Sequence, residues 1–292
     1  MITCVLKGGL CNQLFQIFAI IAYSLRNGNP FLFVYKSHVH IGTKRKLYWD
    51  DFLISLRQFT TYNKHYNISN TDLDSMPMIH LPHHHYQEIP MIPKNENVQI
   101  NSYFQSYKYF KDQEEKIFSM IRLNTQLEVV KKNYASLFAD EVYTISMHFR
   151  LGDYKFIQHS HNILPYEYYE KSIQYMISSL ETLPQTEKIR ILYFCEAEDN
   201  VHVLQVIYRL SQIFNGIEFM KVSDEIQDWE QLLLMACCDS NIIANSSYSW
   251  WGAYFNRNTE KMICYPYLWF GPNLSNLIMD DMFPDTWKKI LF

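Results

Sequence analysis

The 292-residue sequence has little excess of charge of either sign, with 26 lysine and arginine residues against 30 aspartate and glutamate residues. The formal net charge of -4 at pH 7 excludes a general electrostatic attraction to nucleic acid or to an anionic membrane. A bound anion must therefore be held by a local group of basic or hydrogen-bonding side chains.

Cysteine pairs of a structural or metal-binding kind are also lacking. The sequence contains no CxxC pair and no set of cysteine and histidine residues at zinc-ligand spacing. The cysteines lie in apolar stretches, so we expect them to be reduced core residues. They are Cys4, Cys11, Cys195, Cys237, Cys238 and Cys264.

Long apolar runs are absent as well. The most apolar segment, residues 14–25, contains Gln16 and is shorter than the roughly 20 residues that a membrane-spanning helix needs. The N-terminal residues lack the basic, apolar and small-residue regions of a signal peptide. We therefore expect no integral membrane segment and a cytoplasmic location.

Length and pattern favour an α/β protein of two domains, because the chain is about twice as long as a common domain. It opens with a strand, a Gly-rich turn, a helix and the expected strand 30–35, after which residues 38–95 lose regular periodicity. From residue 142 onward, strands alternate with helical segments, as in a parallel doubly wound sheet. We place the boundary near 138, giving domains 1–138 and 139–292 that face across a cleft. One large α/β domain is the alternative.

The segment MHFRLGDYKF, residues 147–156, ends an expected strand with a cluster of polar residues. Ligands of parallel sheets bind beyond the carboxyl ends of the strands. His148 and Arg150 are two residues apart, so they point to one side, and the arginine fork suits phosphate oxygens. An ion pair between Arg150 and Asp153 that only fixes the loop explains the same residues.

Two other turns suit anions. The segment NSSYSWWGA, residues 245–253, puts Ser247 and Ser249 at a helix start, and GGLCNQ, residues 8–13, puts Asn12 at another. The second segment is neither a GxGxxG motif nor a P-loop. Simple helix capping explains both equally.

Carboxylates follow a further expected strand in YFCEAED, residues 193–199. Beside a nucleotide, one of the carboxylates Glu196, Glu198 and Asp199 could accept hydrogen bonds from guanine or from ribose hydroxyls. A solvated acidic helix start is the alternative. The adjacent histidines 83–85 lack a supporting carboxylate pattern, so we expect no metal site there.

Five segments together resemble the α-1,2-fucosyltransferase family, inverting glycosyltransferases that use GDP-fucose. In chain order they are GGLCNQLFQ, YFQSYKYF, HFRLGDY, LPYEYYEKSI and SSYSWWGA. The resemblance covers most of the chain. It implies a GT-B fold of two Rossmann-like domains, with the sugar nucleotide mainly in the C-terminal domain and no cofactor or required metal.

The resemblance also implies roles for single residues. Arg150 would bind the β-phosphate, His148 would lie near the guanine or the phosphate, and Glu196 would contact the nucleoside. The full set implied to bind GDP-fucose is Asn12, His148, Arg150, Glu196, Ser247 and Ser249.

Three positions depart from the family pattern. Cys11 stands where the family usually has glycine, and Leu151 replaces the second arginine of a double-arginine motif. The family's FSDD strand end reads FCEAED here. Arg150 is therefore the only guanidinium that the motif retains.

These features predict inverting, metal-independent transfer of fucose from GDP-fucose to the 2-hydroxyl of a galactose or similar sugar, with Arg150 stabilising the departing GDP. Asp153 is the candidate general base, and Glu88, Asp50 and Asp51 are alternatives. Another linkage or GDP-sugar, a catalytically inactive nucleotide-sugar-binding protein and a structural protein are the competing hypotheses. The lack of an anchor suggests a microbial or viral origin.

Overall fold

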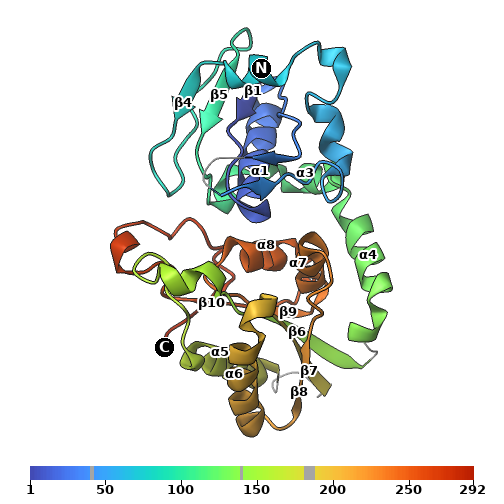
Figure 1. Cartoon of the computed structure of the whole chain (residues 1–292), viewed down its shortest axis with the longest axis vertical. Helices are drawn as coiled ribbons and strands as arrows, with labels where there is room; N and C mark the ends of the chain where they lie inside the picture. The colour runs from blue at the N-terminus through green and yellow to red at the C-terminus, as the bar shows by residue number, and fades with distance from the viewer. Residues whose placement is uncertain (40–42, 139–140, 181–187) are drawn as a thin grey trace. The chain divides into compact units, whose positions relative to one another are not determined.

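The structure is a computed structural model that describes residues 1–39, 43–138, 141–180 and 188–292 (Figure 1). The chain forms two compact units. The first contains Met1–Asn124 and Leu277–Pro284, and the second contains Thr125–Asn276 and Asp285–Phe292. The boundary expected near residue 138 thus falls inside the second unit. The return of a C-terminal segment to the first unit was not expected, because its sequence carries no pattern that points there.

The first unit is built on a parallel three-stranded sheet of order β1-β5-β4. The strands are β1 (Ile2–Cys4), β4 (Met78–His80) and β5 (Val98–Asn101). Helix α1 (Leu10–Asn27) follows β1 and is buried over most of its length, because it is apolar on nearly all sides. It ends at Gly28, whose left-handed backbone is typical of a helix C-terminus. The expected opening strand, turn and helix are therefore confirmed.

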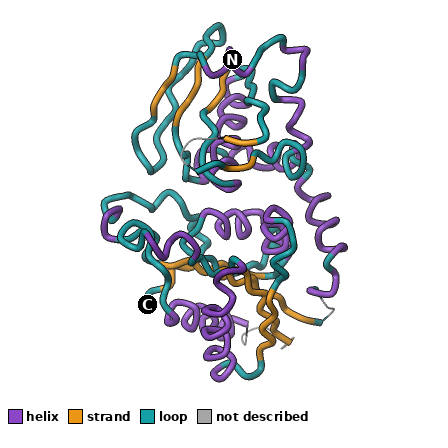
Figure 2. The backbone as a smooth tube through the Cα atoms, viewed as in Figure 1, coloured by secondary structure: helices purple, strands orange, loops and turns teal. Residues whose placement is uncertain are grey.

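The second strand expected in this unit, at 30–35, does not form. Residues there make only isolated bridges, Ile2 to Phe31 and Phe33 to Thr60. Loops and turns dominate the following residues, as their sequence predicted (Figure 2). The short elements of this part are β2 (His38–Val39), β3 (Arg45–Lys46), 3-10 helices Ile54–Phe59, Lys64–Tyr66, Tyr107–Tyr109 and Lys111–Gln113, α2 (Asn70–Asp74) and α3 (Glu114–Met120).

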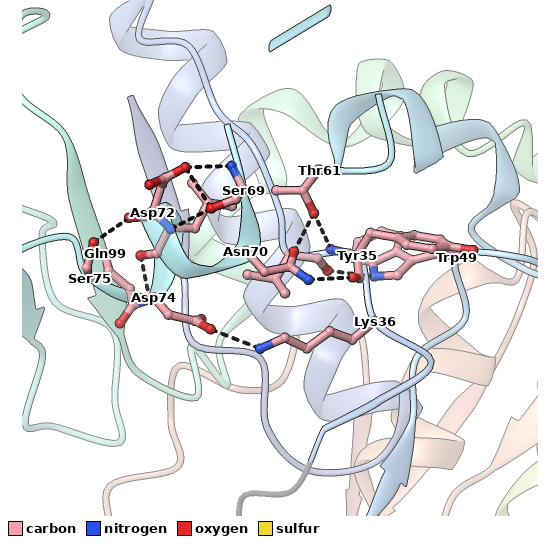
Figure 3. A network of polar contacts seen from close by, with 12 residues as sticks. Tyr35, Lys36, Trp49, Thr61, Ser69, Asn70, Asp72, Asp74, Ser75 and Gln99 are labelled. Carbon is pink, nitrogen blue, oxygen red and sulfur yellow. Dashed lines mark hydrogen bonds and ion pairs between the residues drawn. The ribbon is translucent and has the colours of Figure 1, made fainter. Parts of the chain in front are cut away.

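A polar network holds this irregular part together (Figure 3). The Thr61 hydroxyl donates to Asn70 Oδ1 at 2.5 Å and accepts from the Tyr35 backbone N–H at 2.9 Å. The Asn70 amide donates to the Tyr35 carbonyl at 2.9 Å. Ser69 and Asp72 cap α2 reciprocally in a capping box. Side chains here replace the backbone ladder that a regular strand would have supplied.

The second unit contains a parallel six-stranded sheet of order β11-β10-β9-β6-β7-β8. β6 pairs with both β7 and β9, so the strand order reverses between β6 and β9. This reversal is the topological switch point of a doubly wound fold. The expected α/β class with a parallel, doubly wound sheet is confirmed. The strands are β6 (Val142–His148), β7 (Lys188–Phe194), β8 (Ile217–Lys221), β9 (Ser240–Ile242), β10 (Ile263–Pro266) and β11 (Lys288–Ile290).

Helices cover both faces of this sheet, with α5 and α6 on one face and α7 and α8 on the other (Figure 1). Leu151, which follows β6, is 4% exposed and belongs to the same apolar core as Ile145 and Met147. An arginine in its place would have to bury a guanidinium, which explains why leucine suits this chain. The helices of this unit are α4 (Leu123–Asn133), which begins at its boundary, α5 (Tyr166–Leu180), α6 (Asn200–Ile213), α7 (Asp228–Cys237) and α8 (Ser247–Phe255).

The structure bears on two expectations, that the cysteines are reduced core residues and that no segment spans a membrane. All six cysteines are free and five are buried, and burial raises the pKa of the Cys237 thiol to about 11. Among the described residues, no helix combines the length and the apolar character that crossing a membrane requires.

Candidate functional site

The switch point of the second unit gathers the polar residues that the sequence singled out. His148 ends β6 in register with Phe194, which ends β7, and Met147 pairs with Ile242, which ends β9. The three loops that follow these strands therefore leave the sheet at one edge. This is the edge where doubly wound folds bind their ligands.

Arg150 lies in the first of these loops between two carboxylates. Its guanidinium forms ion pairs with Asp153 and with Glu196, and its Cζ lies 5.0 Å from the centre of the Tyr154 ring. The arginine side chain is 23% exposed, whereas the carboxylates are about half exposed, at 55% and 47%. The ion pair considered as the simpler explanation is therefore present, and Glu196, from the next strand, joins it.

A further carboxylate, Asp199, fixes the loop after β6, a role that the sequence did not assign to it. It is fully buried, accepts from the Gly152 backbone N–H at 2.8 Å and forms an ion pair with Lys155. A buried charge is stable only when it is paired and hydrogen-bonded in this way. Gly152 has φ +33°, and a Cβ there would lie 3.0 Å from Glu196 Cδ, so glycine allows both the turn and the close approach of Glu196.

His148 is buried and uncharged at neutral pH. Burial, and then the positive charge of Arg150, lowers its pKa to about 3. Its Nδ1 has no hydrogen-bond partner among the described residues, and its ring lies 5.5 Å from the ring of Tyr248. A neutral imidazole can offer either a donor or an acceptor to a ligand, according to its tautomer.

The three serines at the start of α8 make different contacts. Ser246 is the N-cap, and its hydroxyl accepts from the Tyr248 backbone N–H at 3.3 Å. Ser249 is buried, and its hydroxyl accepts from the Ala244 N–H at 3.1 Å. Ser249 thus makes a contact inside the turn, and its expected contact with the diphosphate stays a prediction. Ser247 is half-buried on the first turn of α8.

A group of buried polar atoms near this edge was not predicted. The Tyr154 hydroxyl donates to the Asn245 carbonyl at 3.2 Å, and the His161 ring stacks on Tyr154 at 4.7 Å. Within the described residues, His161 Nδ1, Asn162 Oδ1 and Asn245 Oδ1 are buried without a hydrogen-bond partner. Such atoms usually bind a ligand or ordered water. Asn245 could have been found, since it directly precedes the serine motif, whereas no local signal marks His161.

Asn12 belongs to the first unit and lies in the first turn of α1, directly after the turn that follows β1. Gly8 has φ +77°, and a Cβ there would lie 2.5 Å from the Asn12 amide nitrogen. Gln105, from the YFQSYKYF segment, donates to Asn12 Oδ1 at 2.9 Å, so two of the five motifs meet here. Cys11 lies within α1, and the left-handed backbone falls on Gly8. The glycine missing at position 11 is therefore not required.

The candidate bases differ in their surroundings. Asp50 accepts from Arg57 at 2.8 Å and from Tyr35, and the hydrogen bond from Arg57 is the main cause that lowers its pKa. Asp51 forms an ion pair with Lys46, and Glu88 is exposed. Asp153 pairs with Arg150.

A metal site was not expected at the three adjacent histidines. The rings of His83 and His85 stack at 4.9 Å, and the His84 ring lies 6.4 Å from that of Tyr103. No group of three or more His, Cys, Asp or Glu side chains suited to a metal ion occurs in the described part of the chain.

Comparison with known proteins gives three relatives, although no family model matches the sequence. The chain is 32% identical over 188 residues to the O-antigen biosynthesis glycosyltransferase WbnK of Escherichia coli, covering 61% of this chain and 58% of that protein. It is 25% identical over 302 residues to an alpha-1,2-colitosyltransferase of Escherichia coli, covering 98% of this chain and 97% of the relative. It is 21% identical over 312 residues to a galactoside 2-alpha-L-fucosyltransferase of Caenorhabditis elegans, covering 99% and 79%.

Among solved structures, a GDP complex of Arabidopsis thaliana FUT1 matches with 11% identity and a TM-score of 0.47, covering 90% of this chain and 70% of that one. The match to WbnK spans a little over half of that protein, at 58%, whereas the match to the colitosyltransferase spans 97% of the relative. The names of the relatives agree with the family that the five sequence motifs resemble. The chain is therefore similar to glycosyltransferases of the α-1,2-fucosyltransferase and α-1,2-colitosyltransferase kind.

Proposed function

We propose that this protein transfers fucose from GDP-fucose to the 2-hydroxyl of a galactose or similar sugar, with inversion and without a metal ion. The observation that carries the proposal is the position of Arg150, at the carboxyl end of β6 beside the switch point of a doubly wound sheet. Buried polar atoms of His148, at the end of β6, and of Asn245, after β9, lie at the same edge and have no hydrogen-bond partner among the described residues. This combination suits a diphosphate with a nucleoside attached.

Arg150 would act on the leaving group. As the acceptor oxygen bonds to the anomeric carbon, the bond from that carbon to the β-phosphate oxygen breaks and GDP leaves with an added negative charge. A guanidinium already fixed by the Tyr154 ring and two carboxylates needs little reorganisation to stabilise that charge. A diphosphate oxygen would replace one carboxylate, and Glu196, once released, could accept from the nucleoside.

His148, Ser247 and Asn12 complete the proposed donor site. The neutral His148 ring adds a hydrogen bond without adding charge, and the Ser247 hydroxyl lies at the start of α8, where helix N–H groups favour an anion. Asn12 remains a proposed contact of the sugar nucleotide. Ser249 supports the loop through Ala244.

The acceptor hydroxyl must lose its proton to a base. Asp153 is our first candidate, because it is half exposed and lies beside the guanidinium that would hold the diphosphate. Asp50, Asp51 and Glu88 are the alternatives. Asp50 and Asp51 already form ion pairs with Arg57 and Lys46, and the lowered pKa of Asp50 weakens it as a proton acceptor.

GDP-colitose is a second candidate donor. A relative whose match covers 98% of this chain and 97% of its own length is named an alpha-1,2-colitosyltransferase. A donor site that uses the diphosphate and the nucleoside as anchors leaves the choice of sugar to a few other contacts. The same phosphate contacts would then serve either donor.

The decisive experiment combines turnover with binding. The protein is incubated with GDP-fucose or GDP-colitose and a panel of galactosides, with and without EDTA, and the product linkage is determined. We expect an α-1,2 product whose formation EDTA does not change. A different linkage, or strict dependence on a metal, contradicts the proposal. GDP binding without transfer to any acceptor would favour an inactive nucleotide-sugar-binding protein, and no GDP binding at all would favour a structural role.

Arg150 provides the matched variant test. We expect Arg150→Gln to reduce kcat/KM by about 10²–10³-fold, as when one donor to a developing charge is removed. Arg150→Lys should restore part of the loss, since it keeps the charge but not the fork. Circular dichroism checks that both variants fold. Near-normal turnover by a folded Arg150→Gln enzyme would remove the arginine from the mechanism.

A further inference from the structure

An open hollow of about 610 Å³ in the first unit is lined by basic side chains. Arg57, Lys64, His65 and Arg122 all contribute to its wall, and among its described lining residues none is acidic. Because the whole chain carries a net charge of -4, this local excess of positive charge runs against the overall balance. The similarity to known proteins gives this hollow no role.

Arg57 is held by contacts with two neighbouring side chains. Its guanidinium lies 4.5 Å from the centre of the Tyr62 ring and 2.8 Å from Asp50, and the Tyr35 hydroxyl donates to the same carboxylate at 2.9 Å. Asp50 offsets the charge of Arg57, so the positive charge of the hollow comes from its other basic side chains. In the described part of the chain, Lys64 and Arg122 form no ion pair.

Two further features of the wall, the backbone of Arg122 and the hydroxyl group of Ser55, also suit a bound ligand. Arg122, which is exposed and lies just after α3, has φ +55°, a left-handed conformation that is unfavourable for a non-glycine residue. The buried Ser55 hydroxyl, also on the wall, has no hydrogen-bond partner in the described residues. Within the described residues, the hollow thus combines two basic side chains that form no ion pair, Lys64 and Arg122, with a hydroxyl group, that of Ser55, that has no hydrogen-bond partner.

We infer that this hollow binds an anionic group, a carboxylate or a phosphate, carried by the saccharide acceptor. Lys64 and Arg122 would hold the oxyanion, while the Tyr62 ring, 49% exposed, offers an apolar face to the sugar beside it. That the anion is carried by an acceptor sugar rests on the proposed function. The presence of an anion site rests only on the hollow and its charges.

The test uses the full chain and defined probes in isothermal titration. Digalacturonic acid supplies carboxylates, galactose 6-phosphate supplies a phosphate, galactobiose is the neutral counterpart, and inorganic phosphate lacks the sugar. The double variant Lys64→Gln/Arg122→Gln removes two charges from the hollow. The control Lys44→Gln/Lys94→Gln removes two charges from exposed lysines of the same unit that do not line it.

We expect at least one of the two acidic sugars to bind more tightly than galactobiose, and the hollow variant to weaken that binding by about tenfold or more, with the control unchanged. Which acidic sugar responds identifies the anion. The inference is overturned if neither binds, if both double variants weaken binding equally, or if inorganic phosphate binds as tightly as the sugars. GDP titration of the same samples separates the two proposals: loss of GDP binding alone contradicts the donor site, whereas retained GDP binding without acidic-sugar binding contradicts only this inference.

Discussion

At the carboxyl end of β6, single residues set the charge and shape of the site. His148 stays neutral because it is buried beside Arg150, Leu151 turns into the core, and Gly152 lets Glu196 approach the arginine. The sequence showed which residue types cluster here. It could not show that Glu196, 46 residues away, completes the ion-pair cluster, because that contact depends on β6 and β7 being neighbours.

The buried His148 should make stability depend on pH. Its pKa is about 3 in the folded protein and about 6.5 when unfolded, so only the unfolded state binds the proton between these values. The stabilisation is complete above pH 6.5 and is lost as the pH falls toward 3. Below pH 6, we expect the stability of wild type to fall more steeply than that of His148→Asn, by up to about 1.4 kcal/mol per pH unit. Urea unfolding at pH 7, 6 and 5 measures this, and parallel curves would contradict it.

Gly152 should not tolerate a side chain. Its φ is +33°, and a Cβ would press on the Glu196 carboxyl group. We expect Gly152→Ala to cost about 1–2 kcal/mol of unfolding free energy and to weaken GDP binding, because Glu196 and Arg150 must shift. Gly216→Ala is the control, since a Cβ at that position would meet no other atom within 4 Å. Equal stability of the two variants in urea unfolding would refute this account.

At the scale of elements, periodicity predicted the regular parts and missed those held by side chains. The alternation of strands and helices after residue 142 predicted a doubly wound sheet, which the six-stranded order confirms. Residues 30–35 have the composition of a strand, yet they form only bridges, and polar contacts of Thr61 and Asn70 fix the neighbouring backbone instead. Such contacts join residues distant in sequence, so no local pattern reveals them.

The turn before α1 depends on one glutamine of the GGLCNQLFQ motif. Gln16 is fully buried, accepts from the Lys7 N–H at 2.9 Å and donates to the Lys7 carbonyl at 3.1 Å. We expect Gln16→Leu to lower the unfolding free energy by about 2–3 kcal/mol, because both backbone groups lose their partner. Gln205→Leu, at an exposed position of α6, should be nearly neutral. Thermal unfolding compares the two, and similar melting temperatures would show that the turn does not need the glutamine.

At the scale of the whole chain, sequence order and unit membership differ in one place. Residues 277–284 belong to the first unit, although they follow most of the second in sequence. Asp281 anchors them, because its carboxylate accepts from the Tyr86 N–H at 3.1 Å and from Lys108 at 2.5 Å, and its carbonyl accepts from the Ser106 hydroxyl at 2.6 Å. The sequence offered two adjacent aspartates in a loop, Asp280 and Asp281, which predicts none of these contacts.

Removing this anchor should loosen the first unit and leave the second intact. Asp281→Ala deletes the acceptor of the Tyr86 N–H and the partner of Lys108, for which we expect a loss of about 1–3 kcal/mol. Hydrogen exchange should therefore quicken in peptides that contain Tyr86 and residues 104–110, while exchange in β6 and β9 stays unchanged. Asp280→Ala, at the exposed neighbouring carboxylate, is the matched control. Faster exchange across both units would instead mean that 277–284 stabilise the chain as a whole, because the loss would then spread beyond the contacts that Asp281 makes.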